Sequence, residues 1–318
     1  MHSPDPEPLP GRRCERHDLA LGPDGQCVLC RRDAAPPASR GRVVGLAAFL
    51  VVVLGGAGAY FAWNEGWLRG ADATAEGLPQ TRVQWKERHP LDAPGPMRER
   101  AGLDEAEDYD LAAESFQVFV PEGDGAGGAR GLLVWISPGS SGEVPDDDWG
   151  KVLGKHRLLW VGANRSGNER AVNTRVGLAL TAVENMKRDH EIDGERIWVG
   201  GFSGGAKSAL RALLGFPDVF RGGVFCGGAD YFRPLPAPGG RRWRSGFGRP
   251  QLLPAARQRS MALVVGTEDF NFTHVSAVHA GMGEDGFDDR RLFTVPGIGH
   301  RLPSAETLDE VLTWLDEG

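Results

Sequence analysis

One short stretch, residues 196–210, constrains the fold of this chain more than any other. An apolar run at 197–199 predicts a buried strand, and the Ala and Leu residues after position 205 favour a helix. Between them stands Gly201-x-Ser203-x-Gly205. Glycines on both sides of a serine let a strand turn sharply into a helix and lift the hydroxyl clear of the sheet. A chain with 46 glycines can contain this spacing by chance, but the flanking strand and helix favour the structural interpretation.

Strand and helix patterns alternate from residue 113 to residue 318. This alternation predicts an α/β fold, in which a mostly parallel sheet carries helices on both faces. Ligands bind such a sheet beyond the carboxyl ends of its strands. The expected strands are 115–120, 131–136, 157–161, 197–199, 223–226, 261–265 and 291–295, and the expected helices include 146–156, 172–190 and 305–315.

Two polar residues that follow later strands can complete a catalytic set with Ser203. A serine hydroxyl is a poor nucleophile until a base takes its proton, and that base needs an acid to orient it. Asp269 follows the expected strand 261–265, and His300 follows the expected strand 291–295. Both would therefore lie at the edge of the sheet where the serine turn lies.

Other polar residues keep alternatives open. Glu268 is next to Asp269 and could serve as the acid instead. His274 and His279 fall in an expected helix, so they fit the role of base less well. The segment 164–168, Asn-Arg-Ser-Gly-Asn, follows a strand on the same side and could line a pocket.

With these residues in view, the segment from about residue 114 to residue 318 resembles the α/β-hydrolases. Its Gly-Phe-Ser-Gly-Gly turn is similar to that of the polyhydroxybutyrate depolymerase and feruloyl esterase-like branch. The resemblance implies that Ser203 is the nucleophile, Asp269 the acid and His300 the base. It also implies an oxyanion hole made by the N–H groups of Gly204 and Ser140, although relatives carry His-Gly where this chain has Pro-Gly before Ser140. An ester substrate, rather than an amide, is implied by the resemblance alone.

The segment 231–260 carries seven arginines and no acidic residue. In α/β-hydrolases this region often covers the active site. The arginines therefore suggest a cationic rim that selects anionic esters. The alternative is a loop that rests on solvent or on acidic lipid headgroups.

Two close pairs of metal-binding residues lie near the N-terminus. Cysteine and histidine in this arrangement can surround one tetrahedral zinc ion, and a segment this poor in apolar residues would draw its folding energy from the metal. The alternative is an unstructured tail with scattered thiols. The four residues of the predicted structural zinc knuckle are Cys14, His17, Cys27 and Cys30.

An uncharged run of 21 residues at 43–63 predicts a transmembrane helix, because it is long enough to cross the hydrocarbon core. A cleaved signal peptide is the alternative, although no clean cleavage site follows. Arginines precede the run, and acidic residues outnumber the single Arg69 after it. The positive-inside rule then places residues 1–42 in the cytosol and the rest outside, in the periplasm or the extracellular space. Residues 64–112, rich in Gly, Ala and acids, are expected to be a spacer before a hydrolase domain at 113–318.

These observations favour a membrane-anchored serine hydrolase, an esterase, that needs no cofactor for catalysis. A formal net charge of −7 argues against a general nucleic-acid binder. The expected partners are a small or polymeric ester, the membrane and a cytosolic protein that binds the knuckle. One alternative is an inactive hydrolase-like sensor that couples an outside ligand to a cytosolic partner. A serine peptidase ranks lower, because no large domain precedes the hydrolase segment.

Overall fold

A computed structural model describes residues 78–102, 109–122 and 128–318 of the protein. These residues all fall in the second of the two units, Met1–Trp67 and Leu68–Gly318, into which the chain divides. None of the helices within these three ranges is long and apolar enough to cross a membrane. The predicted transmembrane helix at 43–63 and the four predicted zinc ligands lie outside the described residues.

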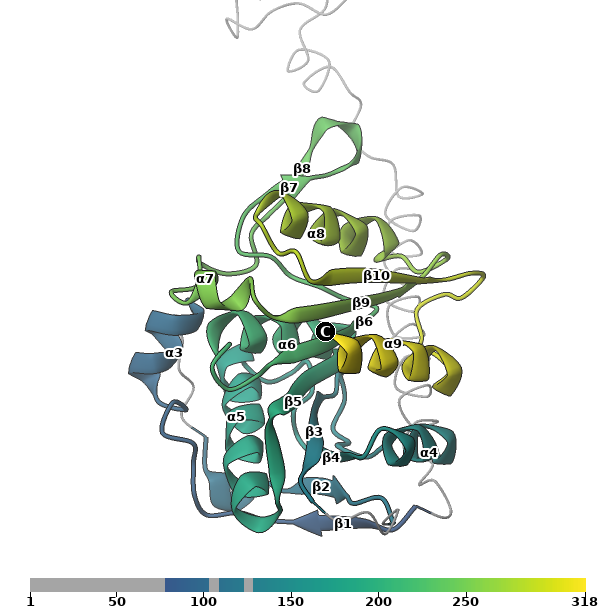
Figure 1. Ribbon diagram of the computed structural model, residues 1–318. Coiled ribbons are helices and arrows are strands. Elements are labelled where there is room, and N and C mark those ends of the chain that lie inside the picture. The colour runs from purple at the N-terminus through teal and green to yellow at the C-terminus, as the bar shows by residue number, and fades with distance from the viewer. Residues whose placement is uncertain (1–77, 103–108, 123–127) are drawn as a thin grey trace, which may run out of the picture. The chain divides into compact units, whose positions relative to one another are not determined.

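A sheet of eight strands forms the centre of the described fold (Figure 1). The antiparallel pairs are β1 with β2 and β2 with β4, and every other neighbouring pair is parallel. The prediction of a mostly parallel sheet is confirmed. In spatial order the strands are β1 (Gln80–Val83), β2 (Phe116–Phe119), β4 (Leu158–Ala163), β3 (Arg130–Ile136), β5 (Ile192–Phe202), β6 (Gly222–Cys226), β9 (Ser260–Gly266) and β10 (Arg290–Val295).

Helices cover both faces of the sheet (Figure 1). The strands are buried on both sides, so their residues alternate between two apolar clusters. In β5, Ile197 and Val199 belong to the first cluster, whereas Trp198 and Phe202 belong to the second. The first cluster packs against α3 (Pro94–Ala101), α5 (Val172–Asp189), α6 (Gly204–Gly215), α7 (Leu253–Ala256) and α8 (Phe272–Glu284); the second packs against α4 (Asp147–Lys155) and α9 (Ala305–Glu317).

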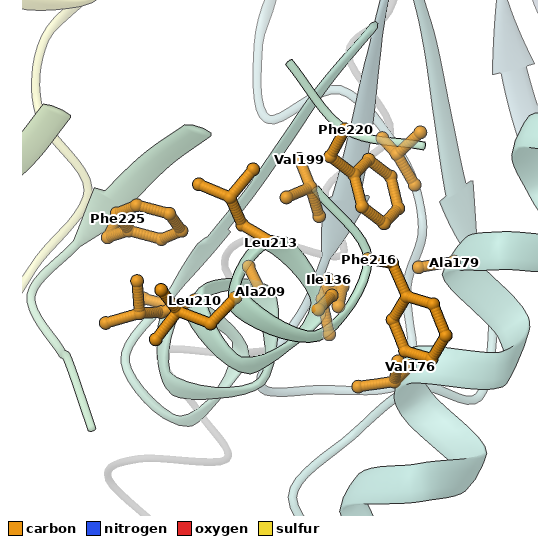
Figure 2. Packing of buried hydrophobic residues seen from close by; sticks show 14 of the residues in the cluster. Ile136, Val176, Ala179, Val199, Ala209, Leu210, Leu213, Phe216, Phe220 and Phe225 are labelled. Carbon is orange, nitrogen blue, oxygen red and sulfur yellow. The ribbon is translucent and has the colours of Figure 1, made fainter. Parts of the chain in front are cut away.

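The first cluster fixes α6 against the middle of the sheet. Leu213 of α6 lies next to Val199 of β5, Leu210 lies next to Phe225 of β6, and Phe216 lies against Val176 of α5 (Figure 2). All of these side chains are fully buried. Because α6 begins one residue after Ser203, this packing sets the position of the serine turn.

Part of the expected spacer belongs to the fold, which corrects the predicted boundary at residue 113. β1 pairs with β2 at the edge of the sheet, and the side chains of Trp85, Met97 and Ala101 are buried in the first cluster. The Trp85 ring lies 4.7 Å from the Phe116 ring. A few apolar residues carry this burial, and the Gly-, Ala- and acid-rich composition around them conceals them in the sequence.

The helices α4 and α9 are joined by a charged cluster around His156, which follows α4. Both ring nitrogens of His156 lie 2.8 Å from carboxylate oxygens, one of Asp309 and one of Asp316. Burial alone would lower the pKa of His156, but the two hydrogen bonds and the two negative charges outweigh burial and raise it. The ring can donate to both carboxylates at once only when it is protonated, so this contact is an ion pair at pH values below the raised pKa of His156.

The stability that His156 contributes is therefore expected to depend on pH. Its pKa is higher in the folded state than the unfolded value of 6.5, so its contribution is full below pH 6.5 and is lost as the pH rises through the folded pKa. His156→Gln should lower the free energy of unfolding by on the order of 1 kcal/mol near pH 6, and by less as the pH rises. Urea unfolding from about pH 5 to pH 9 measures the difference. In an Asp309→Asn, Asp316→Asn background only burial remains to act on the pKa of His156, so the effect should no longer decrease as the pH rises. A constant difference in the native background would contradict the assignment.

Candidate active site

Ser203 occupies a strained turn between β5 and α6. Its φ of 55° and ψ of −119° lie outside the regions that side-chain-bearing residues usually adopt. Such a conformation costs roughly 1–3 kcal/mol and persists only where the surrounding structure holds it. Here the Ser203 N–H donates to the Cys226 carbonyl at 2.8 Å, which ties the turn to the end of β6.

Three glycines make this turn possible by letting backbone segments approach closely. A Cβ added to Gly205 would overlap the Ile136 carbonyl oxygen at the end of β3. A Cβ on Gly201 would lie 2.6 Å from the same oxygen, and one on Gly228 would overlap the Ser203 carbonyl. The ends of β3, β5 and β6 therefore converge on the start of α6, and the first two glycines are those of the sequence motif.

His300 and Asp269 lie beside Ser203 at the same edge of the sheet. The Nε2 atom of His300 is 2.9 Å from Ser203 Oγ, and its Nδ1 atom is 2.8 Å from Asp269 Oδ2. His300 comes from the loop after β10 and Asp269 from the loop after β9. The structure thus brings together three side chains that span 97 positions of the chain.

A short hydrogen-bond network orients Asp269. Its side chain is 1% exposed. Its second oxygen, Oδ1, accepts the Asn271 N–H at 2.8 Å, and the Asn271 side chain donates to the Gly227 carbonyl at 2.8 Å. The neighbouring Glu268 is exposed. His300 therefore pairs with the buried carboxylate and not with the exposed one.

Two aromatic rings enclose the imidazole of His300. The Phe202 ring lies 4.8 Å from it and the Phe270 ring 4.3 Å, measured between ring centroids. Phe202 is buried, whereas Phe270 is 68% exposed, the most exposed large apolar side chain in the described ranges. An aromatic ring this exposed beside a reactive group offers apolar contact area to a ligand. One signal for this residue was missed in the sequence analysis, namely an aromatic residue directly after the candidate acid.

The two predicted oxyanion donors lie on segments that border the serine turn. Gly204 is the first residue of α6, where a helix leaves its N–H groups without intrahelical acceptors. Ser140 is exposed in the loop after β3, and that loop begins where Ile136 contacts Gly205. The loop is held by a bond from the Asn168 N–H to the Pro138 carbonyl at 2.9 Å. The oxyanion role of both donors remains a prediction.

The segment 164–168 contributes one side chain to the site. Asn164 is buried and structural: its Oδ1 accepts the Gly142 N–H and its Nδ2 donates to Ser115. Asn168, in contrast, is exposed, and its amide lies where a Cβ on Gly204 would be. Asn168 is therefore the member of this segment that reaches the serine turn.

Within the arginine-rich segment 231–260, β7 (Leu235–Pro236) and β8 (Arg242–Trp243) form a small hairpin beside α8 (Figure 1). The Arg233 side chain is paired with Glu284 and Asp285, and Arg259 donates to the Pro217 carbonyl. Trp243 lies 4.7 Å from the His274 ring. His274 lies in α8, and the histidine within hydrogen-bond distance of Ser203 is His300. Arg241, Arg242 and Arg244 are exposed, and a cationic rim formed by these three stays a prediction.

No group of three or more His, Cys, Asp or Glu side chains within 78–102, 109–122 and 128–318 is placed to hold a metal ion. Cys226 is the free cysteine of this part of the chain, and its thiol is buried at the end of β6. Burial raises the pKa of this thiol well above its ordinary value, so Cys226 is a core residue and not a nucleophile.

Comparison with solved structures shows that the chain has the α/β-hydrolase fold. S-formylglutathione hydrolase FrmB from Staphylococcus aureus aligns over 75% of this chain and 97% of its own, with 14% identity and a TM-score of 0.50. Est1E from Butyrivibrio proteoclasticus aligns over 64% of this chain and 93% of its own, with 15% identity and a TM-score of 0.45. A thermostable esterase aligns over 64% of this chain, with 14% identity and a TM-score of 0.44, and the chain spans 59% of its length. No family model and no curated protein matches the sequence.

The close approach at Gly205 gives a prediction about stability. Gly205→Ala should lower the free energy of unfolding by more than about 3 kcal/mol, because the new methyl group meets a backbone carbonyl that cannot move aside. Gly194→Ala, in β5 itself, is the matched control. Nothing lies within 4 Å of a Cβ there, so the change should stay within about 0.5 kcal/mol. Urea unfolding measures both variants, and equal stabilities would show that β3 and α6 do not meet as described.

Proposed function

We propose that this protein is a serine hydrolase that cleaves carboxylic esters with Ser203, His300 and Asp269. One observation carries the proposal: the hydrogen-bonded chain from Ser203 Oγ through both nitrogens of His300 to the buried carboxylate of Asp269. This arrangement is the one that acyl transfer by a serine requires. The strained turn supports the same proposal, since such strain is typical of functional sites.

In the proposed mechanism each group has one step. When the Nδ1–H of His300 donates to Asp269, the Nε2 lone pair is free to accept the Ser203 hydroxyl proton. The serine oxygen then attacks the ester carbonyl, and the resulting oxyanion is stabilised by the N–H groups of Gly204 and Ser140. The imidazolium returns its proton to the departing alcohol, which leaves an acyl group on Ser203. A water molecule, deprotonated by the same ring, releases the acid and restores the serine.

The similarity of this chain to known esterases favours an ester over an amide as the substrate. FrmB is an S-formylglutathione hydrolase, and the sequence of this chain resembles the feruloyl esterase-like branch. The exposed Phe270 ring supports an ester with an apolar acyl or alcohol group, because such a group can pack on the ring beside His300.

Loss of Ser203 should abolish most of the activity. Ser203→Ala is expected to lower kcat on 4-nitrophenyl butyrate by about 10³- to 10⁶-fold, and Asp269→Asn by a smaller but still large factor, because the imidazole loses its orientation. Thermal unfolding of both variants serves as the control for folding. Glu268→Gln, at the exposed neighbouring acid, should keep nearly full activity.

A fluorophosphonate probe separates an enzyme from an inactive sensor. Labelling of Ser203 in the native protein, but not in Ser203→Ala or His300→Asn, is the expected result. Folded protein whose Ser203 stays unmodified would instead favour the binding function.

We also propose that residues 43–63 anchor the enzyme in a membrane with residues 1–42 in the cytosol and the hydrolase domain outside, and that Cys14, His17, Cys27 and Cys30 bind one structural zinc. The membrane anchor is supported by the length of the run 43–63 and by its lack of charged residues. The zinc site is supported by the spacing of its four proposed ligands. In this arrangement the zinc knuckle would be the part that meets a cytosolic partner.

The zinc content of the purified full chain tests the knuckle. About one zinc per chain is expected, and Cys27→Ser should remove most of it. Cys226→Ser, which changes a buried free thiol, should leave the zinc content unchanged. Equal loss in both variants would contradict the assignment.

A further inference from the structure

A buried guanidinium contacts the loop that carries Ser140, one of the two proposed oxyanion donors. Arg175, in the first turn of α5, is 4% exposed. Burial lowers the pKa of this arginine to about 10, so the group is still charged at neutral pH. Among the described residues no ion pair joins a carboxylate to Arg175, and Glu169 acts on its pKa through charge alone, without a hydrogen bond.

Arg175 donates two hydrogen bonds, and both go to backbone carbonyls. Its Nε atom lies 2.6 Å from the Ser166 carbonyl, and one terminal nitrogen lies 3.0 Å from the Ser137 carbonyl. Burying a charge without an acid is unfavourable unless hydrogen bonds compensate. These two hydrogen bonds therefore compensate for the unfavourable burial of the charged Arg175 guanidinium.

The two carbonyls belong to the two loops that border the serine turn. Ser137 opens the loop after β3 that carries Ser140, and Ser166 lies in the loop after β4 that carries Asn168. A bond from the Asn168 N–H to the Pro138 carbonyl joins the loops, and the Asn168 side chain contacts Gly204. One guanidinium thus contacts both of the loops that border the start of α6.

We propose that Arg175 is a positioning residue for ester hydrolysis. Its two hydrogen bonds to the Ser137 and Ser166 carbonyls hold the loop that carries Ser140 in place relative to Ser203. The inference rests on the proposed function. A planar guanidinium can hold two carbonyls in fixed directions at once, whereas a lysine ammonium is a single point on a flexible stem. The positioning role therefore requires the planar guanidinium with its two donors, and a positive charge alone does not fulfil it.

Two substitutions in the full-length protein test this role. Arg175→Lys keeps the positive charge but loses the planar guanidinium, and Arg175→Met loses both the charge and the guanidinium. Each should lower kcat on 4-nitrophenyl butyrate by about 10- to 100-fold with KM changed by less than about threefold, since the loop acts on the transition state. The rate of Ser203 phosphonylation by a fluorophosphonate should fall in parallel. Lys187→Met, on the exposed last turn of the same helix, is the matched control and should behave as the native protein.

The outcomes separate this inference from the proposed function. Thermal unfolding establishes that each variant is folded, and Arg175→Lys decides the question if Arg175→Met does not fold. A folded Arg175→Lys variant with native kcat, or with a loss confined to KM, would overturn the positioning role while the hydrolase proposal stands. If the native protein itself neither cleaves esters nor reacts with the probe, the proposed function fails first.

Discussion

The backbone turn at Ser203 is the constraint on which the rest of the site depends. Its positive φ is unfavourable for serine, and the turn exists because β5 enters it and α6 leaves it in directions that packing fixes on both sides. Gly201, Gly205 and Gly228 supply the space. The free energy of burying the apolar face of α6 therefore holds a local conformation that the residue alone would avoid.

The parallel part of the sheet brings the remaining groups to this turn. β9 and β10 run parallel to β6 and β5, so the loops after them end at the same edge, where Asp269 and His300 meet Ser203. Phe202 and Phe270 enclose the imidazole, and Arg175 ties two further loops to the same edge. In the proposed reaction, each contact restricts the motion of a group that would transfer a proton or stabilise charge, and this preorganisation would be the contribution of the fold to catalysis.

The features that depend on a local sequence pattern, namely the serine turn and the residues that follow the strands, could be predicted from the sequence. The strand, turn and helix around Ser203 are contiguous, and Asp269 and His300 follow strands whose apolar runs are easily recognised, so their convergence could be expected. β1 and α3 were missed because few apolar residues carry their burial. Arg175 was missed because a charged residue in a helix is normally exposed, and only the assembled loops show that its partners are carbonyls. The exposed ring of Phe270 could be recognised as part of the site only once the structure showed that it lies beside His300.

The most direct measurement of the central claim is a crystal structure of the protein after reaction with a 4-nitrophenyl alkylphosphonate. The account predicts a covalent bond from Ser203 Oγ to phosphorus, with the phosphonyl oxygen about 2.7–3.1 Å from the N–H nitrogens of Gly204 and Ser140. His300 should keep its contact with Asp269 in the same crystal. A phosphonyl oxygen turned away from both nitrogens, or phosphorus attached to another residue while Ser203 is unmodified, would contradict it.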